Sequence, residues 1–306
     1  MTLDLSRRAF LGTTAALPLL RSRPADAAPL ALSGGPQGRA EGDAPKFKLG
    51  TITYNVGAGW ELPTLLHVCK TTGFGYVELR TTHAHKVEPD LSAEQRRDVK
   101  KQFEDAGVRL WSFGTVCEFH ASEPGVVTKN IEECRAFCKL AADLGAKGVK
   151  VRPNGVPKGG DPARTFEQIG AALKECGKAA QDHGVEIWVE VHGAVTQNPP
   201  SMRAILDACG HPAVGICWNS NATDVKDGSI KESFDLLKKD IRSCHINELW
   251  SGYPYRELFA GLKSIGFDRV TLMECPGVPE APNAKNPEAA IRFMRYYKAL
   301  WTELCR

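Results

Sequence analysis

The chain has 306 residues, of which 42% are hydrophobic and 25% are charged. This composition is ordinary for a globular protein, and it excludes a disordered chain and a bundle of membrane helices. The length suits one large domain, because a (β/α)8 barrel typically takes about 250 residues.

The first 28 residues have the pattern of an export signal. Residues 6–11 read SRRAFL, residues 11–20 form a mildly apolar run, and residues 25–28 are small or acidic. The paired arginines Arg7 and Arg8 resemble those of a twin-arginine signal, which predicts an exported, periplasmic protein. A basic N-terminal tail is the alternative interpretation. The apolar run is too short for a stable membrane span, and residues 29–45, rich in Gly, Pro, Ala and Ser, predict a flexible linker.

The net charge gives no reason to expect a polyanionic partner. The formal charge is +3, and removal of residues 1–28 takes away four arginines and two aspartates, which leaves +1. So small a charge predicts no binding to nucleic acid or to an anionic lipid surface.

Ten cysteines in an exported chain would ordinarily suggest disulfides. The chain has no CxxC pair, however, and Cys217, Cys244 and Cys275 lie in or beside apolar strand-like runs, where cysteine is usually a small core residue. We therefore expect mostly free, buried thiols, with a disulfide as the alternative.

From Phe47 onward, short apolar or β-branched runs alternate with stretches of helical periodicity. Strands are predicted at residues 49–54, 75–79, 109–115, 148–152, 186–191, 214–218, 243–246 and 270–274. Helices are predicted at residues 62–71, 93–106, 131–144, 166–183, 202–208, 230–239, 255–265 and 287–304. Gly107, Gly145 and Gly184 follow three of these helices as C-terminal stops.

Eight alternating strands and helices predict a parallel sheet, and eight units that close on themselves predict a single (β/α)8 TIM barrel over residues 46–306. A doubly wound open sheet is the alternative, but it usually has a glycine-rich phosphate loop after its first strand. Gly57-Ala58-Gly59 is only a fragment of such a loop.

Metal-binding side chains end three of the predicted strands. Glu190, His245 and Glu274 lie at strand ends, which meet at one rim in a parallel barrel. Two carboxylates and an imidazole suit a divalent cation. Each residue alone also has a structural reading, as a helix cap or a salt-bridge partner, but burial of several carboxylates without a cation is costly.

Further polar side chains share faces with these residues, because side chains alternate along a strand. Lys150 and Arg152 could bind substrate or simply pair with Glu78 and Glu190. The predicted substrate-binding residues are Glu78, His120, Lys150, Arg152, His192 and Asn247.

The region from Phe47 to the C-terminus resembles the xylose isomerase-like TIM-barrel superfamily, which includes sugar isomerases, sugar 3-epimerases and hydroxypyruvate isomerase. The resemblance rests on the strand-end order Glu, Asp, His or Gln, Glu. It implies that Glu190, His245 and Glu274 hold one divalent ion, either Mn²⁺, Mg²⁺, Co²⁺ or Zn²⁺. Asn219 stands where the family has Asp, and its amide oxygen can coordinate a metal but brings no charge. Asp224 as a substitute ligand, or loss of the metal, are the alternatives.

The resemblance implies a metal-dependent sugar isomerase or epimerase. Glu190 and Glu274 would then be catalytic and exchange a proton next to a carbonyl through an enediolate. The same site could instead cleave 3-keto-glycosides, and a non-catalytic sugar-binding barrel is a further alternative. The expected partner is a carbohydrate or glycoside, and the sequence leaves a homo-oligomer open.

Overall fold

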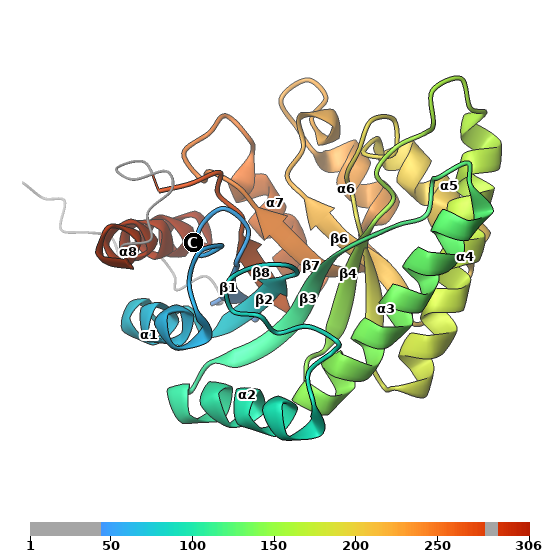
Figure 1. Ribbon diagram of the computed structural model, residues 1–306. Helices are drawn as coiled ribbons and strands as arrows, with labels where there is room; N and C mark the ends of the chain where they lie inside the picture. Colours follow the sequence, from blue (N-terminus) through green and yellow to red (C-terminus); the bar gives the residue numbers. More distant parts are fainter. Residues whose placement is uncertain (1–43, 279–286) are drawn as a thin grey trace, which may run out of the picture. The chain divides into compact units, whose positions relative to one another are not determined.

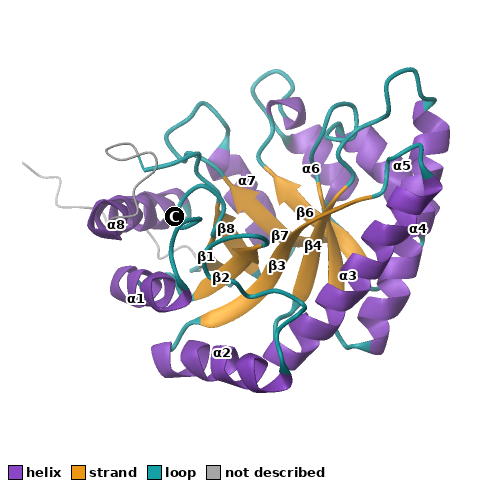
Figure 2. Cartoon of the chain, viewed as in Figure 1, coloured by secondary structure: helices purple, strands orange, loops and turns teal. Residues whose placement is uncertain are grey.

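Eight parallel strands form a closed barrel in which each strand is bonded to the next along the chain, and β8 closes on β1 (Figures 1 and 2). The computed structural model describes residues 44–278 and 287–306; the predicted export signal and most of the predicted linker lie outside these residues. The strands are β1 Lys48–Ile52, β2 Tyr76–Arg80, β3 Arg109–Glu118, β4 Gly148–Arg152, β5 Glu186–Glu190, β6 Val214–Asn219, β7 Ile241–Ile246 and β8 Val270–Met273. The prediction of a single (β/α)8 barrel is confirmed.

A helix follows each strand and covers the outside of the barrel (Figure 2). The helices are α1 Leu62–Thr72, α2 Ala93–Ala106, α3 Pro124–Leu144, α4 Pro162–Asp182, α5 Pro199–Cys209, α6 Lys231–Leu237, α7 Tyr255–Ser264 and α8 Pro287–Leu304. In the described part of the chain, none of them is both long enough and apolar enough to cross a bilayer.

Three helices begin earlier than their periodicity predicts. Helix α3 starts at Pro124, seven residues before the predicted start, α4 at Pro162, four residues before it, and α5 at Pro199, three residues before it. Proline suits the first helical position, where its missing N–H would have no partner. The first turn of α3 contains glycine and β-branched residues, which weaken the helical pattern. A 3₁₀ turn at Ala222–Asp224, labelled η1, was also not predicted.

The hydrophobic core lies between the strands and the helices. Outward-facing strand residues such as Val77, Val149 and Val189 are completely buried there. All ten cysteines are buried with free thiols, which agrees with their expected role as small core residues.

Three aromatic side chains, Tyr76, Trp111 and Trp188, pack together in the N-terminal half of the barrel. Trp111 contacts both of the others, with ring centroids 5.9 Å from Tyr76 and 5.5 Å from Trp188. Gly148 leaves room for this packing, because a Cβ atom there would lie 2.6 Å from the Trp188 ring. The inward-facing polar residues at the other end of the strands therefore stand on a packed aromatic layer.

Candidate functional site

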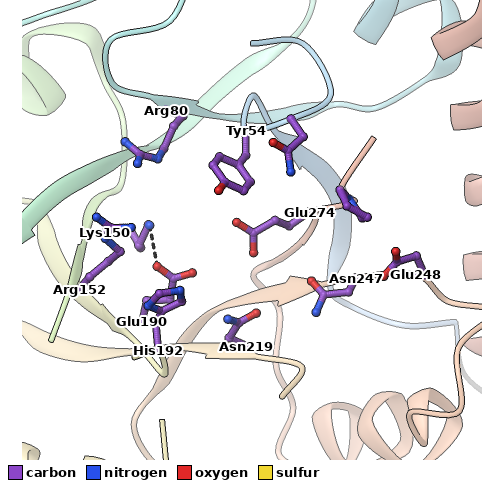
Figure 3. A pocket seen from close by; sticks show the side chains of 12 residues that line it. Tyr54, Arg80, Lys150, Arg152, Glu190, His192, Asn219, Asn247, Glu248 and Glu274 are labelled. Carbon is purple, nitrogen blue, oxygen red and sulfur yellow. Dashed lines mark hydrogen bonds and ion pairs between the residues drawn. The ribbon is translucent and has the colours of Figure 1, made fainter. Parts of the chain in front are cut away.

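A pocket of about 320 Å³ opens at the carboxyl ends of the strands (Figure 3). The residues that line it are Tyr54, Asn55, Arg80, Lys150, Arg152, Glu190, His192, Asn219, Asn247, Glu248, Glu274 and Pro276. The sequence predicted seven of these as site residues. The other five were not predicted: Arg80 ends β2, and Tyr54, Asn55, Glu248 and Pro276 follow β1, β7 and β8. Of these, only Arg80 could have been found from sequence, because alternation along β2 places it on the face of Glu78.

Three of the predicted metal ligands meet at the floor of this pocket. Glu190 ends β5, His245 lies in β7, and Glu274 follows β8. One ligand atom from each lies within 4.8 Å of the ligand atoms of the other two. Nδ1 of His245 is 3.3 Å from Oε1 of Glu190 and 3.2 Å from Oε2 of Glu274. Glu190 and Glu274, which are more than 80 positions apart in sequence, thus meet His245 at one point.

His245 is oriented by a buried carboxylate on the opposite side of its ring. Its Nε2 lies 3.2 Å from Oε1 of Glu78, while the hydroxyl of Ser112 donates to Oε2 of Glu78 at 2.7 Å. Because a carboxylate only accepts, Nε2 donates to Glu78, and Nδ1 faces Glu190 and Glu274, where its lone pair would be available to a bound cation. Burial opposes ionisation of Glu78, but His245 and Lys150 hold its pKa below the usual value. Glu78 therefore lies beneath the pocket, where it holds the imidazole.

Lys150 and Glu190 form a buried ion pair at the edge of the site. Nζ of Lys150 donates to Oε2 of Glu190 at 2.7 Å, and each side chain is 3% exposed. Burial disfavours both charges. Even so, Lys150 and His245 lower the pKa of Glu190 well below its usual value, and Glu190, Glu78 and Glu274 raise the pKa of Lys150. The surroundings of Glu190 therefore favour its ionised form.

Among the four predicted metal ligands, two buried atoms make no hydrogen bond within the described residues: Oδ1 of Asn219, and Nδ1 of His245, whose two carboxylate neighbours are close but not in hydrogen-bonding geometry. Unpartnered buried polar atoms are rare because each carries a desolvation penalty. Burial lowers the pKa of His245, but Cys217, Glu274 and Glu78 raise it well above the usual value, so the surroundings favour positive charge at this ring. A divalent cation between Glu190, Asn219, His245 and Glu274 would satisfy all of these groups, and the residues present therefore fit one.

Asn219 is held by bonds that join three neighbouring strand ends. The hydroxyl of Ser220 donates to the carbonyl of His245 at 3.1 Å, and Nδ2 of Asn221 donates to the carbonyl of Val191 at 2.6 Å. Nδ2 of Asn247 also donates to the carbonyl of Ser220, at 3.2 Å. The predicted fourth ligand thus sits on backbone that is fixed from both sides.

Asp224 does not point to the metal-binding residues. Its Oδ2 accepts from the backbone N–H of Asn221 at 2.9 Å and from the hydroxyl of Tyr253 at 3.0 Å, and Nε1 of Trp218 donates to that hydroxyl at 3.1 Å. Burial raises the pKa of Asp224 to about 7. The alternative that Asp224 replaces the missing acid is therefore wrong, because this side chain instead joins the loops after β6 and β7.

Four of the six predicted substrate-binding residues, Lys150, Arg152, His192 and Asn247, line the pocket. The other two do not. Glu78 is completely buried below it, and His120 lies two residues beyond the end of β3, outside the lining.

Residues 66–297 match the family of xylose isomerase-like TIM barrels. The chain belongs to this family. No curated protein sequence matches it.

Solved structures share the fold at low identity. A D-psicose 3-epimerase from Clostridium cellulolyticum H10 is 15% identical, with a TM-score of 0.72 over 85% of this chain and 100% of that chain. The IOLI protein, solved with a zinc atom, is 19% identical, with a TM-score of 0.69 over 85% and 98%. The 3-keto-D-glucoside 4-epimerase YcjR from E. coli is 13% identical, with a TM-score of 0.66 over 85% and 100%.

Proposed function

We propose that the protein is a metal-dependent enzyme of the sugar isomerase or epimerase type, which moves a proton on a carbon next to a carbonyl group. The observation that carries this proposal is the convergence of Glu190, His245 and Glu274, with ligand atoms within 4.8 Å of one another, at the floor of a pocket. The sugar epimerases among the structural neighbours support the substrate class.

Glu190, Asn219, His245 and Glu274 would hold the ion. Two carboxylates and two neutral donors give it a net ligand charge of −2, and Lys150 offsets part of that charge through Glu190. When bound, a divalent ion polarises a carbonyl oxygen and acidifies the proton on the neighbouring carbon. Zn²⁺, Mn²⁺ and Co²⁺ accept mixed oxygen and imidazole ligands more readily than Mg²⁺ does.

The two carboxylates differ in their ability to carry a proton. Glu190 is 3% exposed and paired with Lys150, whereas Glu274 is 16% exposed and has no lysine or arginine within 4.0 Å among the described residues. Glu274 therefore supplies the base that takes the first proton from carbon. In isomerisation Glu274 returns this proton to the neighbouring carbon; in epimerisation it releases the proton to water while Glu190 passes a proton from water to the opposite face of the substrate.

Cleavage of a 3-keto-glycoside is the second candidate, because elimination starts with the same proton abstraction next to a carbonyl. A 3-keto-D-glucoside 4-epimerase is among the structurally similar proteins, and this supports the second candidate. We also propose export through the predicted twin-arginine signal, which would expose the enzyme to glycosides. Release of a reducing sugar from a 3-keto-glucoside separates cleavage from epimerisation.

Solvent exchange tests the proposed function. Purified protein is supplied with Mn²⁺, Co²⁺ or Zn²⁺ and incubated in D₂O with ketoses such as D-fructose and D-psicose and with a 3-keto-glucoside. We expect deuterium to enter at the carbon next to the carbonyl, and Glu274→Gln to slow this entry at least about 10²-fold. Glu104→Gln, on the exposed face of α2, is the matched control and retains exchange. Turnover without deuterium at that carbon would exclude the mechanism.

A further inference from the structure

Three cationic side chains, Arg80, Lys150 and Arg152, gather on one side of the pocket, across from Glu274 and Glu248 (Figure 3). They come from β2 and β4, which are separated by β3. At the level of the pocket β3 contributes Gly114, which pairs with Arg80 on one side and with Lys150 on the other. Because glycine has no side chain, β3 places no side chain between Arg80 and Lys150 at this level; farther along β3, Glu118 pairs with Arg152.

The three cations differ in whether the protein already neutralises them. Lys150 is paired with Glu190, and Arg152 forms an ion pair with Glu118. Arg80 has no carboxylate within 4.0 Å among the described residues. Its guanidinium donates one hydrogen bond, from Nη1 to Oγ1 of Thr81 at 3.0 Å, and lies 5.9 Å from the ring centre of Tyr54.

The two guanidiniums have donors left over. A guanidinium carries five N–H donors and stays protonated in proteins. Arg80 uses one of its donors on a neighbouring hydroxyl, and Nε of Arg152 is buried without a partner. Burial and the nearby charge of Arg152 lower the pKa of Arg80, and Glu190, Tyr54 and Glu78 offset this only in part, so a counter-charge in direct contact would stabilise this guanidinium. Carboxylate and phosphate oxygens match the guanidinium fork and supply that charge.

We propose that the substrate carries an anionic group, a carboxylate or a phosphate, which binds Arg80 and Arg152 at this side of the pocket. This inference rests on the proposed function, which places the carbonyl end of the same substrate beside Glu190, His245 and Glu274. A pocket of about 320 Å³ holds one such molecule with both ends engaged. The preferred substrate class is thus a sugar acid or a sugar phosphate rather than a neutral sugar.

Paired ligands that differ in one anionic group test this proposal without requiring turnover. Calorimetry measures the affinity of the wild-type protein for D-gluconate against D-glucitol, and for D-fructose 6-phosphate against D-fructose, with and without Mn²⁺. We expect at least one charged member to bind ten or more times tighter than its neutral partner. A preference in the first pair alone identifies carboxylate as the group, and a preference in the second pair alone identifies phosphate.

Variants of Arg80 test whether this residue causes the preference for the charged ligand. Arg80→Gln should lower the affinity for the favoured anion at least tenfold and leave the affinity for its neutral partner unchanged. Arg80→Lys should restore part of the lost affinity. Arg97→Gln, on the exposed face of α2, is the matched control and should change neither affinity. Equal affinities within both pairs, absence of binding by all four ligands, or a preference that Arg80→Gln leaves intact would each overturn the proposal.

These outcomes are separate from failure of the proposed function. Deuterium exchange with neutral sugars, together with equal affinities within each pair, would support the proposed function and exclude the anion-binding site. Tight anion binding that depends on Arg80, without exchange on any substrate, would keep the anion site and reject the reaction.

Discussion

Glu78 and His245 are joined through the centre of the barrel: Oε1 of Glu78 lies 3.2 Å from Nε2 of His245, and both side chains are completely buried. This contact directs Nδ1 toward Glu190 and Glu274. Carboxylates that hold a ligating histidine in this way fix its tautomer and its ring orientation.

Substitution Glu78→Gln should weaken metal binding without removing any ligand. The amide keeps the shape of the side chain but loses the charge that holds the Nε2 proton, so we expect the affinity for Zn²⁺ or Mn²⁺ to fall about 10–100-fold. Calorimetric titration of the metal-free protein measures this. Unchanged affinity in this variant would show that Glu78 does not position the imidazole.

Gly114→Ala should disturb the same contact from the neighbouring strand. A Cβ atom at Gly114 would lie 2.8 Å from Oε1 of Glu78 and 3.3 Å from Cδ1 of Ile52. Because both neighbours are buried, we expect a loss of about 1–3 kcal/mol in the free energy of unfolding, together with weaker metal binding. Gly125→Ala is the control, because a Cβ atom there meets nothing within 4 Å. Equal denaturant midpoints for the two variants would contradict this account.

Lys150→Met tests the buried ion pair. Removal of the ammonium leaves the carboxylate of Glu190 buried without its partner, and breaking such a pair typically destabilises a protein by about 3–5 kcal/mol. A divalent ion would return positive charge to Glu190. We therefore expect a saturating metal to raise the melting temperature of this variant more than that of the wild type. The same metal-induced shift in both proteins would mean that the ion does not contact Glu190.

Asp224 should make stability depend on pH near neutrality. Its pKa is about 7 in the folded protein, against 3.8 as the ordinary value. Since the folded pKa is raised, the contribution of Asp224 to stability is fully present below about pH 4 and is lost as the pH rises toward 7. Between pH 5 and pH 8 the wild type should lose about 2–3 kcal/mol more than Asp224→Asn in its free energy of unfolding. Parallel denaturation curves for the two proteins across this range would refute the assignment.

Periodicity was sufficient to predict the barrel, since strand and helix patterns alternate eight times and parallel strands bring their carboxyl ends together. The same alternation placed Lys150 on the face of Arg152 and His245 on the face of Asn247, and all but His245 line the pocket.

Features that depend on contacts across the fold could not be predicted from sequence. The direction of Asp224 depends on Tyr253, 29 positions away, and the role of Glu78 depends on His245, 167 positions away. Arg80 was not among the predicted site residues, because its lack of a carboxylate partner within the described residues becomes visible only when the strands are assembled.

The metal content of the purified protein tests the central claim most directly. Elemental analysis and calorimetry with Mn²⁺, Mg²⁺, Co²⁺ and Zn²⁺ should find one divalent ion per chain in the wild type and none in His245→Ala. Asn219→Asp should tighten binding, because a third carboxylate adds charge to the ligand set. A wild-type protein that binds none of these four ions would contradict the existence of the metal site.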